Sequence, residues 1–262
     1  MSEGTLRDRV AIVTGGGTGL GRAIADELSR LGAKVVVASR QLEVVEQAAR
    51  EIENAGGEAL AVRVDVRSPE KVQDLLERAK ERFGYVDTLV NNAAGNFRVP
   101  AEEMSVNAWN AVIDIVLNGT WYCTQTVGRE MISAGGGVIL NIGTTAAFHG
   151  GPSTVHSACA KAGVLAMTRT LAVEWARHNV RVNILTPGPT EETGAVGQLF
   201  SDEKAHEKVL RGVPLKRLAR RREVADAAAY LLSDYAAFVN GENLIVDGGR
   251  WLGRDHYSDD PA

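Results

Sequence analysis

Hydrophobic residues occur along the chain in short runs, separated by stretches in which they recur every three or four positions. A short apolar run is typical of a buried strand, and the wider spacing is typical of a helix with one buried face. The first run covers residues 10–13 and precedes Leu20, Ile24, Leu28 and Leu31, which share one helical face. The same pattern predicts a helix at residues 42–54 and strands at residues 34–39, 59–64, 88–91, 138–143, 181–185 and near 244–246.

Strands that are apolar on both faces and alternate with helices predict a parallel sheet covered by helices on each side. The expected fold class is therefore α/β, as a single doubly wound Rossmann-type domain over residues 1–262. Ligands of such folds bind beyond the carboxyl ends of the strands. The loops expected around this cleft begin at Gly15, Arg40, Asp65, Asn92, Gly143 and Pro187. We also expect a substrate lid at about residues 190–212 and a polar tail at 255–262.

Composition narrows the classes of function. The 262 residues are 45% hydrophobic and 24% charged, as in one compact domain, and the net charge of −4 without a basic block argues against nucleic-acid binding. No signal-peptide core and no apolar run near the ~20 residues of a membrane span occur, so a cytoplasmic location without membrane contact is expected. Cys123 and Cys159 lack the spacing of a metal site, so no metal is predicted.

The turn after the first predicted strand is rich in glycine. Residues without side chains let backbone N–H groups and the start of a helix approach a pyrophosphate. A tight structural turn would explain the glycines equally well by themselves, but their place after the first strand favours a dinucleotide. The residues of this turn expected to bind the cofactor are Gly15, Thr18, Gly19 and Leu20.

The end of the second predicted strand indicates which dinucleotide is bound. A site selective for NAD offers a carboxylate to the adenosine 2′-hydroxyl, whereas this chain has Ser39 and Arg40 there. A guanidinium forms charge-assisted hydrogen bonds to a 2′-phosphate. The alternative is an arginine that is merely exposed to solvent. We interpret Arg40 as a phosphate ligand and predict NADP(H) as the cofactor.

Several spaced motifs resemble the short-chain dehydrogenase/reductase family over residues 8–252. They are the glycine-rich turn from Thr14 to Gly21, Asp65-Val66, Asn91-Asn92-Ala93-Ala94-Gly95, Lys161, Pro187-Gly188-Pro189 and Asp247-Gly248-Gly249. The resemblance implies that Asp65 and Val66 contact adenine, and that Asn92 and Ala93 flank the adenosine ribose. It also implies that Lys161 binds the nicotinamide ribose and that Pro187, Gly188 and Thr190 lie beside the nicotinamide.

The chain departs from this family at its catalytic acid. The family has a tyrosine four residues before the lysine, and this chain has Ser157 there. A serine hydroxyl is a much poorer proton donor than a phenol with a pKa near 10, so interconversion of ketones and alcohols is disfavoured. The asparagine of the family's proton relay aligns with Val116. Its other hydroxyl residue aligns with Thr144, which can still donate a hydrogen bond to a substrate oxygen.

Four stretches are more similar to the 2,4-dienoyl-CoA reductases and peroxisomal trans-2-enoyl-CoA reductases of this family. They are Gly95-Asn96-Phe97, Asn107-Ala108-Trp109, the stretch from Val155 to Gly163, and Leu171 to Trp175. The likeness implies that Asn96, Ser157 and Lys161 contact the substrate or cofactor. The additional acids of the two subgroups fall on Ala146 and Val116, so neither acid is present.

The hypothesis from these residues is an NADPH-dependent reductase of unsaturated acyl-CoA thioesters, most consistent with a 2,4-dienoyl-CoA reductase. Its expected catalytic residues are Lys161, Ser157, Asn96 and Thr144, because donors at the thioester oxygen stabilise the charge that develops there. The alternatives are a trans-2-enoyl-CoA reductase, a carbonyl or 3-ketoacyl reductase with an unusual acid, and an NADP-binding protein without catalytic activity.

The same likeness predicts partners. Arg67 is expected to meet the phosphates of an acyl-CoA, and Phe97 and Ser105 match positions that contact the substrate. His156, beside Ser157, is interpreted as a helix-start residue and not as an acid. The helices expected near residues 107–134 and 152–177 resemble the tetramer interface of the family, so a homotetramer is predicted.

Overall fold

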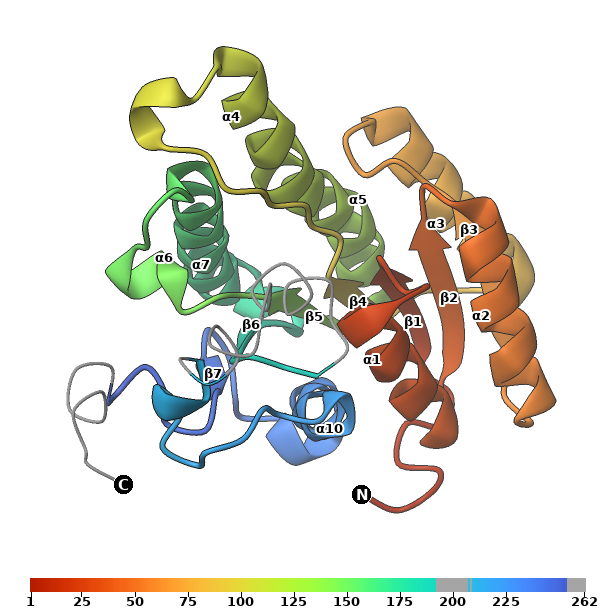
Figure 1. Cartoon of the computed structure of the whole chain (residues 1–262). Coiled ribbons are helices and arrows are strands. Elements are labelled where there is room, and N and C mark those ends of the chain that lie inside the picture. Colours follow the sequence, from red (N-terminus) through yellow and green to blue (C-terminus); the bar gives the residue numbers. More distant parts are fainter. Residues whose placement is uncertain (192–206, 208, 254–262) are drawn as a thin grey trace.

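A computed structural model describes residues 1–191, 207 and 209–253 of the chain. In this part of the chain, seven parallel strands form one sheet in the order β3-β2-β1-β4-β5-β6-β7 (Figure 1). The order reverses at β1, because the chain runs outward to β2 and β3 and then returns to β4. The predicted doubly wound α/β fold is therefore confirmed. The strands are β1 (Val10–Thr14), β2 (Lys34–Ser39), β3 (Ala59–Arg63), β4 (Thr88–Asn91), β5 (Gly137–Ile142), β6 (Val180–Pro187) and β7 (Asn243–Val246).

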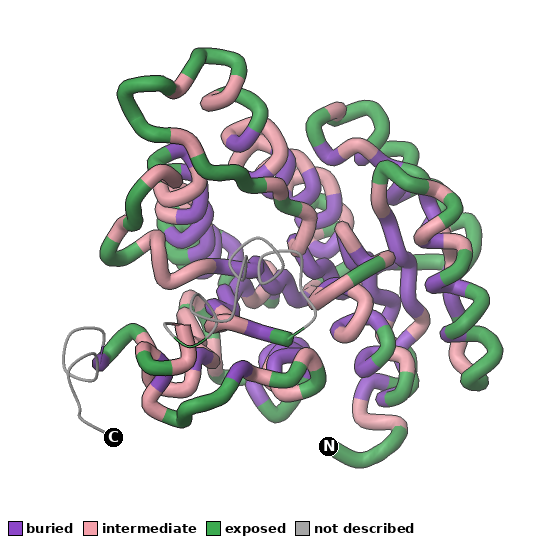
Figure 2. Tube along the Cα trace, in the orientation of Figure 1, coloured by how far each residue is buried: buried purple, intermediate pink, exposed green. Residues whose placement is uncertain are grey.

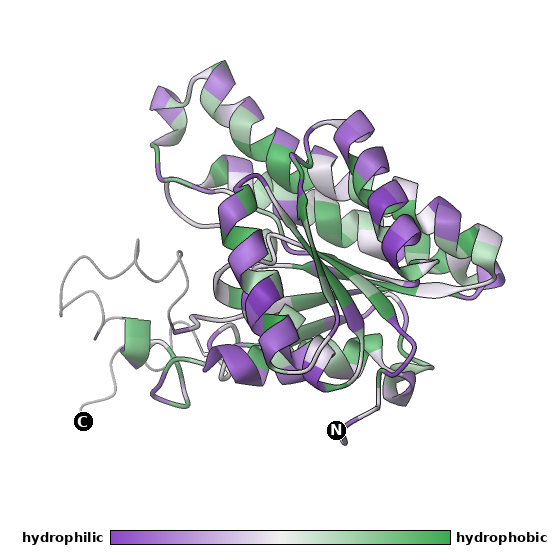
Figure 3. Ribbon diagram, turned by 90° about the vertical axis from the view of Figure 1, so that its right-hand side faces the viewer, coloured by the Kyte–Doolittle hydropathy of each residue, from purple (hydrophilic) through white to green (hydrophobic). Residues whose placement is uncertain are grey.

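Helices cover both faces of the sheet. One face packs against α1 (Gly19–Arg30), α2 (Leu42–Asn54) and α10 (Arg221–Leu232), and the other against α3 (Pro69–Phe83), α5 (Gly119–Ala134) and α7 (Val155–Trp175). Successive side chains of a strand point to opposite faces, so a strand between two layers must be apolar throughout. Figure 2 shows the buried strands at the centre, and Figure 3 shows hydrophobic strands beneath helices that carry the hydrophilic residues.

The predicted elements agree closely with the observed ones. The strands at residues 34–39 and 88–91 and the helix at 42–54 have the expected bounds. β6 is longer than predicted, because its last four residues, from Ile184 to Pro187, pair with β7. That pairing joins segments far apart in the sequence, and the local pattern of apolar residues does not reveal it.

The two long helices expected at residues 107–134 and 152–177 differ from the prediction. The first is divided into α4 (Val106–Ile113), a π-helical segment η2 (Asp114–Asn118) and α5. The second begins only at Val155, after Ser153 with a φ of 59°. The short elements are η1 (Ala101–Glu103), α6 (Ala146–His149), η3 (Ala176–His178) and η4 (Asp234–Ala236). π-Helical segments inside α-helices occur frequently at functional sites.

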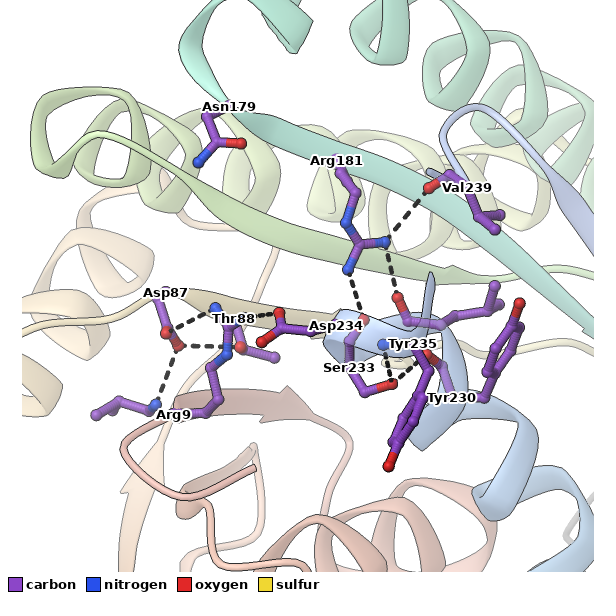
Figure 4. A network of polar contacts seen from close by, with 12 residues as sticks. Arg9, Asp87, Thr88, Asn179, Arg181, Tyr230, Ser233, Asp234, Tyr235 and Val239 are labelled. Carbon is purple, nitrogen blue, oxygen red and sulfur yellow. Dashed lines mark hydrogen bonds and ion pairs between the residues drawn. The ribbon is translucent and has the colours of Figure 1, made fainter. Parts of the chain in front are cut away.

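A polar network ties the amino ends of the strands together (Figure 4). Arg9, just before β1, forms ion pairs with Asp87 and Asp234 at 3.1 Å and 2.7 Å. Arg181, on β6, donates hydrogen bonds to the carbonyl oxygens of Leu231, Val239 and Ser233. A guanidinium satisfies several carbonyl groups at once, including one at the end of α10. The network lies at the end of the sheet opposite to the one where ligands of this fold bind.

Candidate active site

Thr14 and Asn92 hold the glycine-rich turn between β1 and α1. The Thr14 hydroxyl donates to the Val90 carbonyl and accepts from the backbone N–H groups of Asn92 and Ala93, each at 3.1 Å. The Asn92 side chain donates to the carbonyl oxygens of Thr14 and Gly15 at 3.0 Å and 3.2 Å. β1 and the loop after β4 are thereby locked together at the point where the strand order reverses.

The glycines of this turn are required by close packing. The backbone of Gly15 has a φ of 64°, a value that residues other than glycine rarely adopt. A Cβ atom on Gly21 would overlap the Asn92 side chain and the Gly15 carbonyl oxygen. The bare backbone of this turn leaves the first N–H groups of α1 open to a ligand, and such groups bind phosphates. The turn therefore fits the pyrophosphate of a dinucleotide.

A cavity of about 670 Å³ opens in front of this turn. It extends across the carboxyl ends of β1, β2, β3 and β4, as expected for the ligand site of a doubly wound fold. Among the predicted cofactor residues, its lining includes Gly15, Thr18, Gly19, Leu20, Ser39, Arg40, Asp65, Val66, Asn92 and Ala93. The structure thus brings together four segments that are separate in the sequence.

Charged groups gather at the β2 and β3 end of the cavity. Arg40 lines it together with Asp65. The carboxylate of Asp65 accepts hydrogen bonds from Arg67, which, with the charge of Arg40 nearby, lowers the pKa of Asp65 to about 2. Asp65 therefore stays ionised at neutral pH. An arginine at the end of β2 can hold a phosphate, so the residues present fit the adenosine part of NADP(H).

Lys161 lies on α7 and is not among the residues that line this cavity, with only 8% of its surface exposed. Its ammonium group donates a hydrogen bond to the Ile142 carbonyl at the end of β5. Burial lowers the pKa of Lys161 from 10.5 to about 8. A buried cation with a strongly shifted pKa is a candidate functional group.

Ser157 lies one helical turn before Lys161, on the same side of α7. Its neighbour His156 is fully buried, and the His156 ring accepts a hydrogen bond from the Ser157 backbone N–H at 2.8 Å. Thr144 follows β5, two residues after the carbonyl that Lys161 binds, and its hydroxyl accepts from the backbone N–H of Ala146 at 3.4 Å. The predicted residues Lys161, Ser157 and Thr144 therefore come from the end of β5 and the start of α7.

Asn96 and Phe97 belong to the loop after β4, which docks on the start of α7. The rings of Phe97 and His156 meet edge to face, with centroids 4.8 Å apart. The backbone N–H of Val99 donates to the Ser153 carbonyl at 3.0 Å. These two contacts join the loop that carries Asn96, itself exposed, to the helix that carries Ser157.

The remaining predicted residues lie elsewhere. Pro187 ends β6, Gly188 packs closely against the Asp247 backbone, and the buried Thr190 hydroxyl donates to the Gly188 carbonyl at 3.0 Å. The Ser105 hydroxyl accepts from the Ala108 N–H at 3.1 Å, so it caps α4, and its contact with substrate stays a prediction. Most of the predicted lid, residues 192–206 and 208, and all of the tail 255–262 lie outside the described residues.

The positions where related enzymes carry other acids are apolar here. Val116 is buried in η2 among the side chains of Val112, Ala160 and Val164. Its carbonyl oxygen accepts a hydrogen bond from the Thr120 hydroxyl at 2.6 Å. Ala146 begins α6. Neither position offers a proton to a substrate.

Three features of the site were missed by sequence reasoning. Thr14 organises the turn, and a hydroxyl at the last residue of a buried strand was the available signal. Ile115 lines the cavity and lies in the π-helical segment, which the local sequence pattern did not predict. The ring contact between His156 and Phe97 joins residues far apart in the chain.

Within residues 1–191, 207 and 209–253, His, Cys, Asp and Glu side chains do not gather in groups of three or more that would suit a metal ion. Nor does any helix of this part of the chain have the length and apolar character needed to cross a membrane.

The fold and the cavity define a dinucleotide-dependent oxidoreductase. The family model described as enoyl-(acyl carrier protein) reductase matches residues 15–250. The chain belongs to the short-chain dehydrogenase/reductase family, whose members bind NAD(P). The resemblance seen in the sequence motifs is thereby confirmed.

Individual relatives are similar over nearly the whole chain. A probable 2,4-dienoyl-CoA reductase, (2E)-enoyl-CoA-producing, of Bacillus subtilis is 45% identical over 94% of this chain and 98% of its own. A short chain dehydrogenase of Bacillus anthracis has a crystal structure with 46% identity and a TM-score of 0.86, covering 94% and 97% of the two chains. A putative NAD(P) dependent gluconate 5-dehydrogenase of Beutenbergia cavernae, solved with bound NADP, is 36% identical with a TM-score of 0.90, covering 96% and 100%.

Proposed function

We propose that this protein reduces unsaturated acyl-CoA thioesters with NADPH, and that its substrate is a 2,4-dienoyl-CoA. The observation that carries the proposal is Ser157, in place of a phenol, one turn before the buried Lys161 on α7. A carbonyl reductase must protonate an alkoxide and needs a good acid there. The reduction of a conjugated thioester forms no alkoxide, so it tolerates the change. The relative of Bacillus subtilis named as a probable 2,4-dienoyl-CoA reductase supports the same substrate class.

NADPH is the cofactor that the residues favour. Arg40 lines the cavity at the end of β2, where a 2′-phosphate would lie, and the glycine-rich turn accepts the pyrophosphate. When bound, NADPH supplies the hydride. Lys161 would hold the nicotinamide ribose, and Pro187, Gly188 and Thr190 would lie beside the nicotinamide. The similar dehydrogenase of Beutenbergia cavernae, solved with bound NADP, supports this choice.

The side chains around the substrate stabilise negative charge. Addition of hydride to the far carbon of the diene sends an electron pair toward the thioester oxygen. The amide of Asn96 and the hydroxyl groups of Ser157 and Thr144 donate hydrogen bonds to that oxygen, and one such donor lowers a barrier by about 3 kcal/mol. A water ordered by the Lys161 ammonium then gives a proton to a carbon of the dienolate, and the ammonium group replaces the proton that the water has lost. Protonation at C4 gives the 2-enoyl product, and protonation at C2 gives the 3-enoyl product.

Turnover of defined thioesters tests the proposal. The purified protein with 2,4-hexadienoyl-CoA should consume NADPH, measured by its absorbance, while crotonyl-CoA should react more slowly. Ser157→Ala and Asn96→Ala should each lower kcat/KM about a hundredfold with unchanged NADPH affinity. Reaction with a 3-ketoacyl-CoA alone would instead identify a carbonyl reductase. NADPH binding without any thioester turnover would identify a non-catalytic protein.

We also propose that the protein assembles as a homotetramer. Apolar side chains remain exposed on the surface, notably Val173 of α7 at 82% and Phe238, in the turn after η4, at 104%. Burial of such residues between subunits is favourable. Light scattering should therefore give a mass of four chains, and the mass of one chain would contradict the proposal.

A further inference from the structure

Arg67 lies in the turn between β3 and α3, where it makes a two-point contact with Asp65. Its Nε atom donates to Oδ1 of Asp65 at 2.9 Å, and its Nη2 atom donates to Oδ2 at 2.6 Å. The backbone N–H of Arg67 donates to the same Oδ1 at 3.1 Å. A planar guanidinium that meets both oxygens fixes the orientation of a carboxylate as well as its charge.

The turn that carries this pair is rigid. The Ser68 N–H donates to the Asp65 carbonyl at 3.0 Å, and the Ser68 hydroxyl caps α3 by accepting from Lys71 N–H at 3.3 Å. Pro69 follows at the first position of the helix, which suits its fixed φ. The backbone of Arg67 is therefore fixed between a strand end and a helix start, at a position from which its guanidinium reaches Asp65.

Only one member of the pair faces the cavity. Asp65 and Val66 line it, whereas Arg67 is not among the lining residues. The cavity at this point spans the ends of β2 and β3, next to Arg40, where the adenosine half of a dinucleotide lies in this fold. Arg67 thus contacts the carboxylate without itself lining the cavity.

The hydrogen-bond inventory leaves Asp65 one free acceptor position. Oδ1 accepts from the Arg67 backbone N–H and from Nε, and Oδ2 accepts from Nη2, while the single Nε hydrogen is shared with Oδ2 at 3.2 Å. An ionised carboxylate accepts about four hydrogen bonds, and Arg67 supplies only three N–H groups, so the carboxylate can accept one further donor. An adenine presents an exocyclic amino group, which is a donor. A hypoxanthine presents a carbonyl oxygen in its place, which a carboxylate repels.

We propose that Arg67 is a positioning residue of the cofactor site, which fixes the Asp65 carboxylate as acceptor for the adenine amino group and so selects adenine. This inference rests on the proposed NADPH site. It assigns Arg67 to the cofactor, whereas the sequence placed it at the phosphates of the acyl-CoA. The fork leaves only the outer N–H groups of Arg67 for any other anion.

Binding of two cofactors by the whole protein tests this role. We would titrate the protein with NADPH and with reduced nicotinamide hypoxanthine dinucleotide phosphate, following the fluorescence of the reduced nicotinamide. The parent protein should prefer NADPH about tenfold or more, as expected for a charge-assisted hydrogen bond. Arg67→Met should bring the two affinities to within about twofold, chiefly by weakening NADPH. Arg78→Met, at an exposed position of α3, is the matched control and should keep the preference.

Further variants separate positioning from charge and from folding. Arg67→Lys keeps the charge without the fork, so it should also lose most of the preference, and full retention would overturn the proposal. Asp65→Ala should abolish the preference, and adding Arg67→Met to it should change the ratio no further. Thermal unfolding of each variant checks the fold, and Arg67→Lys serves if Arg67→Met does not fold.

The outcomes distinguish this inference from the proposed function. A parent protein that binds NADPH without preferring it to the hypoxanthine analogue refutes the role of Arg67 and leaves the NADPH site standing. An unchanged cofactor ratio with a raised KM for 2,4-hexadienoyl-CoA in Arg67→Met would assign Arg67 to the substrate instead. Failure of the parent protein to bind either dinucleotide would overturn both.

Discussion

Lys161 should make the stability of this protein rise with pH above neutrality. Burial lowers its pKa to about 8 in the folded protein, against 10.5 for an ordinary lysine. Between these two values the unfolded chain binds more protons than the folded protein. Stability increases with pH wherever the unfolded state binds more protons, so raising the pH through this range favours the folded state.

The size of the effect follows from the two pKa values. The whole difference between the two pKa values corresponds to about 3 kcal/mol in the free energy of unfolding. Between pH 7 and pH 9.5 the free energy of unfolding should increase by about 2 kcal/mol of this amount. Lys161→Met removes the titrating group and keeps an unbranched chain of similar length. In the variant the Ile142 carbonyl loses its lysine donor. This loss lowers the free energy of unfolding of the variant by the same amount at every pH, so it does not alter the pH dependence.

Urea denaturation at several pH values between 7 and 9.5 measures the difference. The free energy of unfolding of the parent protein, minus that of Lys161→Met, should increase by about 2 kcal/mol over this range. Other groups titrate in both proteins and cancel in the subtraction. A difference that stays constant with pH would show that Lys161 has an ordinary pKa, and the account of its burial would be refuted.

Three further substitutions have defined outcomes. Arg40→Ala should weaken the binding of NADPH by about 1.5 to 3 kcal/mol and the binding of NADH much less. Equal losses of affinity for the two cofactors in binding titrations would contradict the 2′-phosphate role. Gly21→Ala should cost about 1 to 3 kcal/mol of stability and weaken dinucleotide binding, because its methyl group meets Asn92; unchanged thermal unfolding and affinity would refute this. Arg181→Met should lower the free energy of unfolding by about 3 kcal/mol without changing NADPH affinity, since three carbonyl groups lose their donor.

The sequence by itself determined the elements and the site that depends on them. Apolar runs of strand length and helical spacings are local patterns, so the bounds of β2, α2 and β4 were predicted without the structure. The carboxyl ends of parallel strands meet at one edge of a sheet, so the sequence predicted that Gly15, Arg40 and Asp65 lie at one cleft. In the structure they line the same cavity.

Tertiary structure decided the contacts between segments. The π-helical segment at Asp114–Asn118 has no signature in the spacing of its apolar residues, yet it brings Ile115 to the cavity. Lys161 was predicted as a ribose ligand, but its bond to the Ile142 carbonyl at the end of β5 depends on how α7 packs against the sheet. The partners of a long side chain depend on three-dimensional neighbours, which a one-dimensional pattern does not contain.

Arg67 shows the same division within a single turn. Its position just after Asp65-Val66 was visible in the sequence, and a cation near the cleft suggested a phosphate of the substrate. The structure turns its fork back onto the Asp65 carboxylate, two residues away. Which anion a flexible guanidinium meets depends on the backbone path of the turn, and that path follows from the packing of β3 and α3.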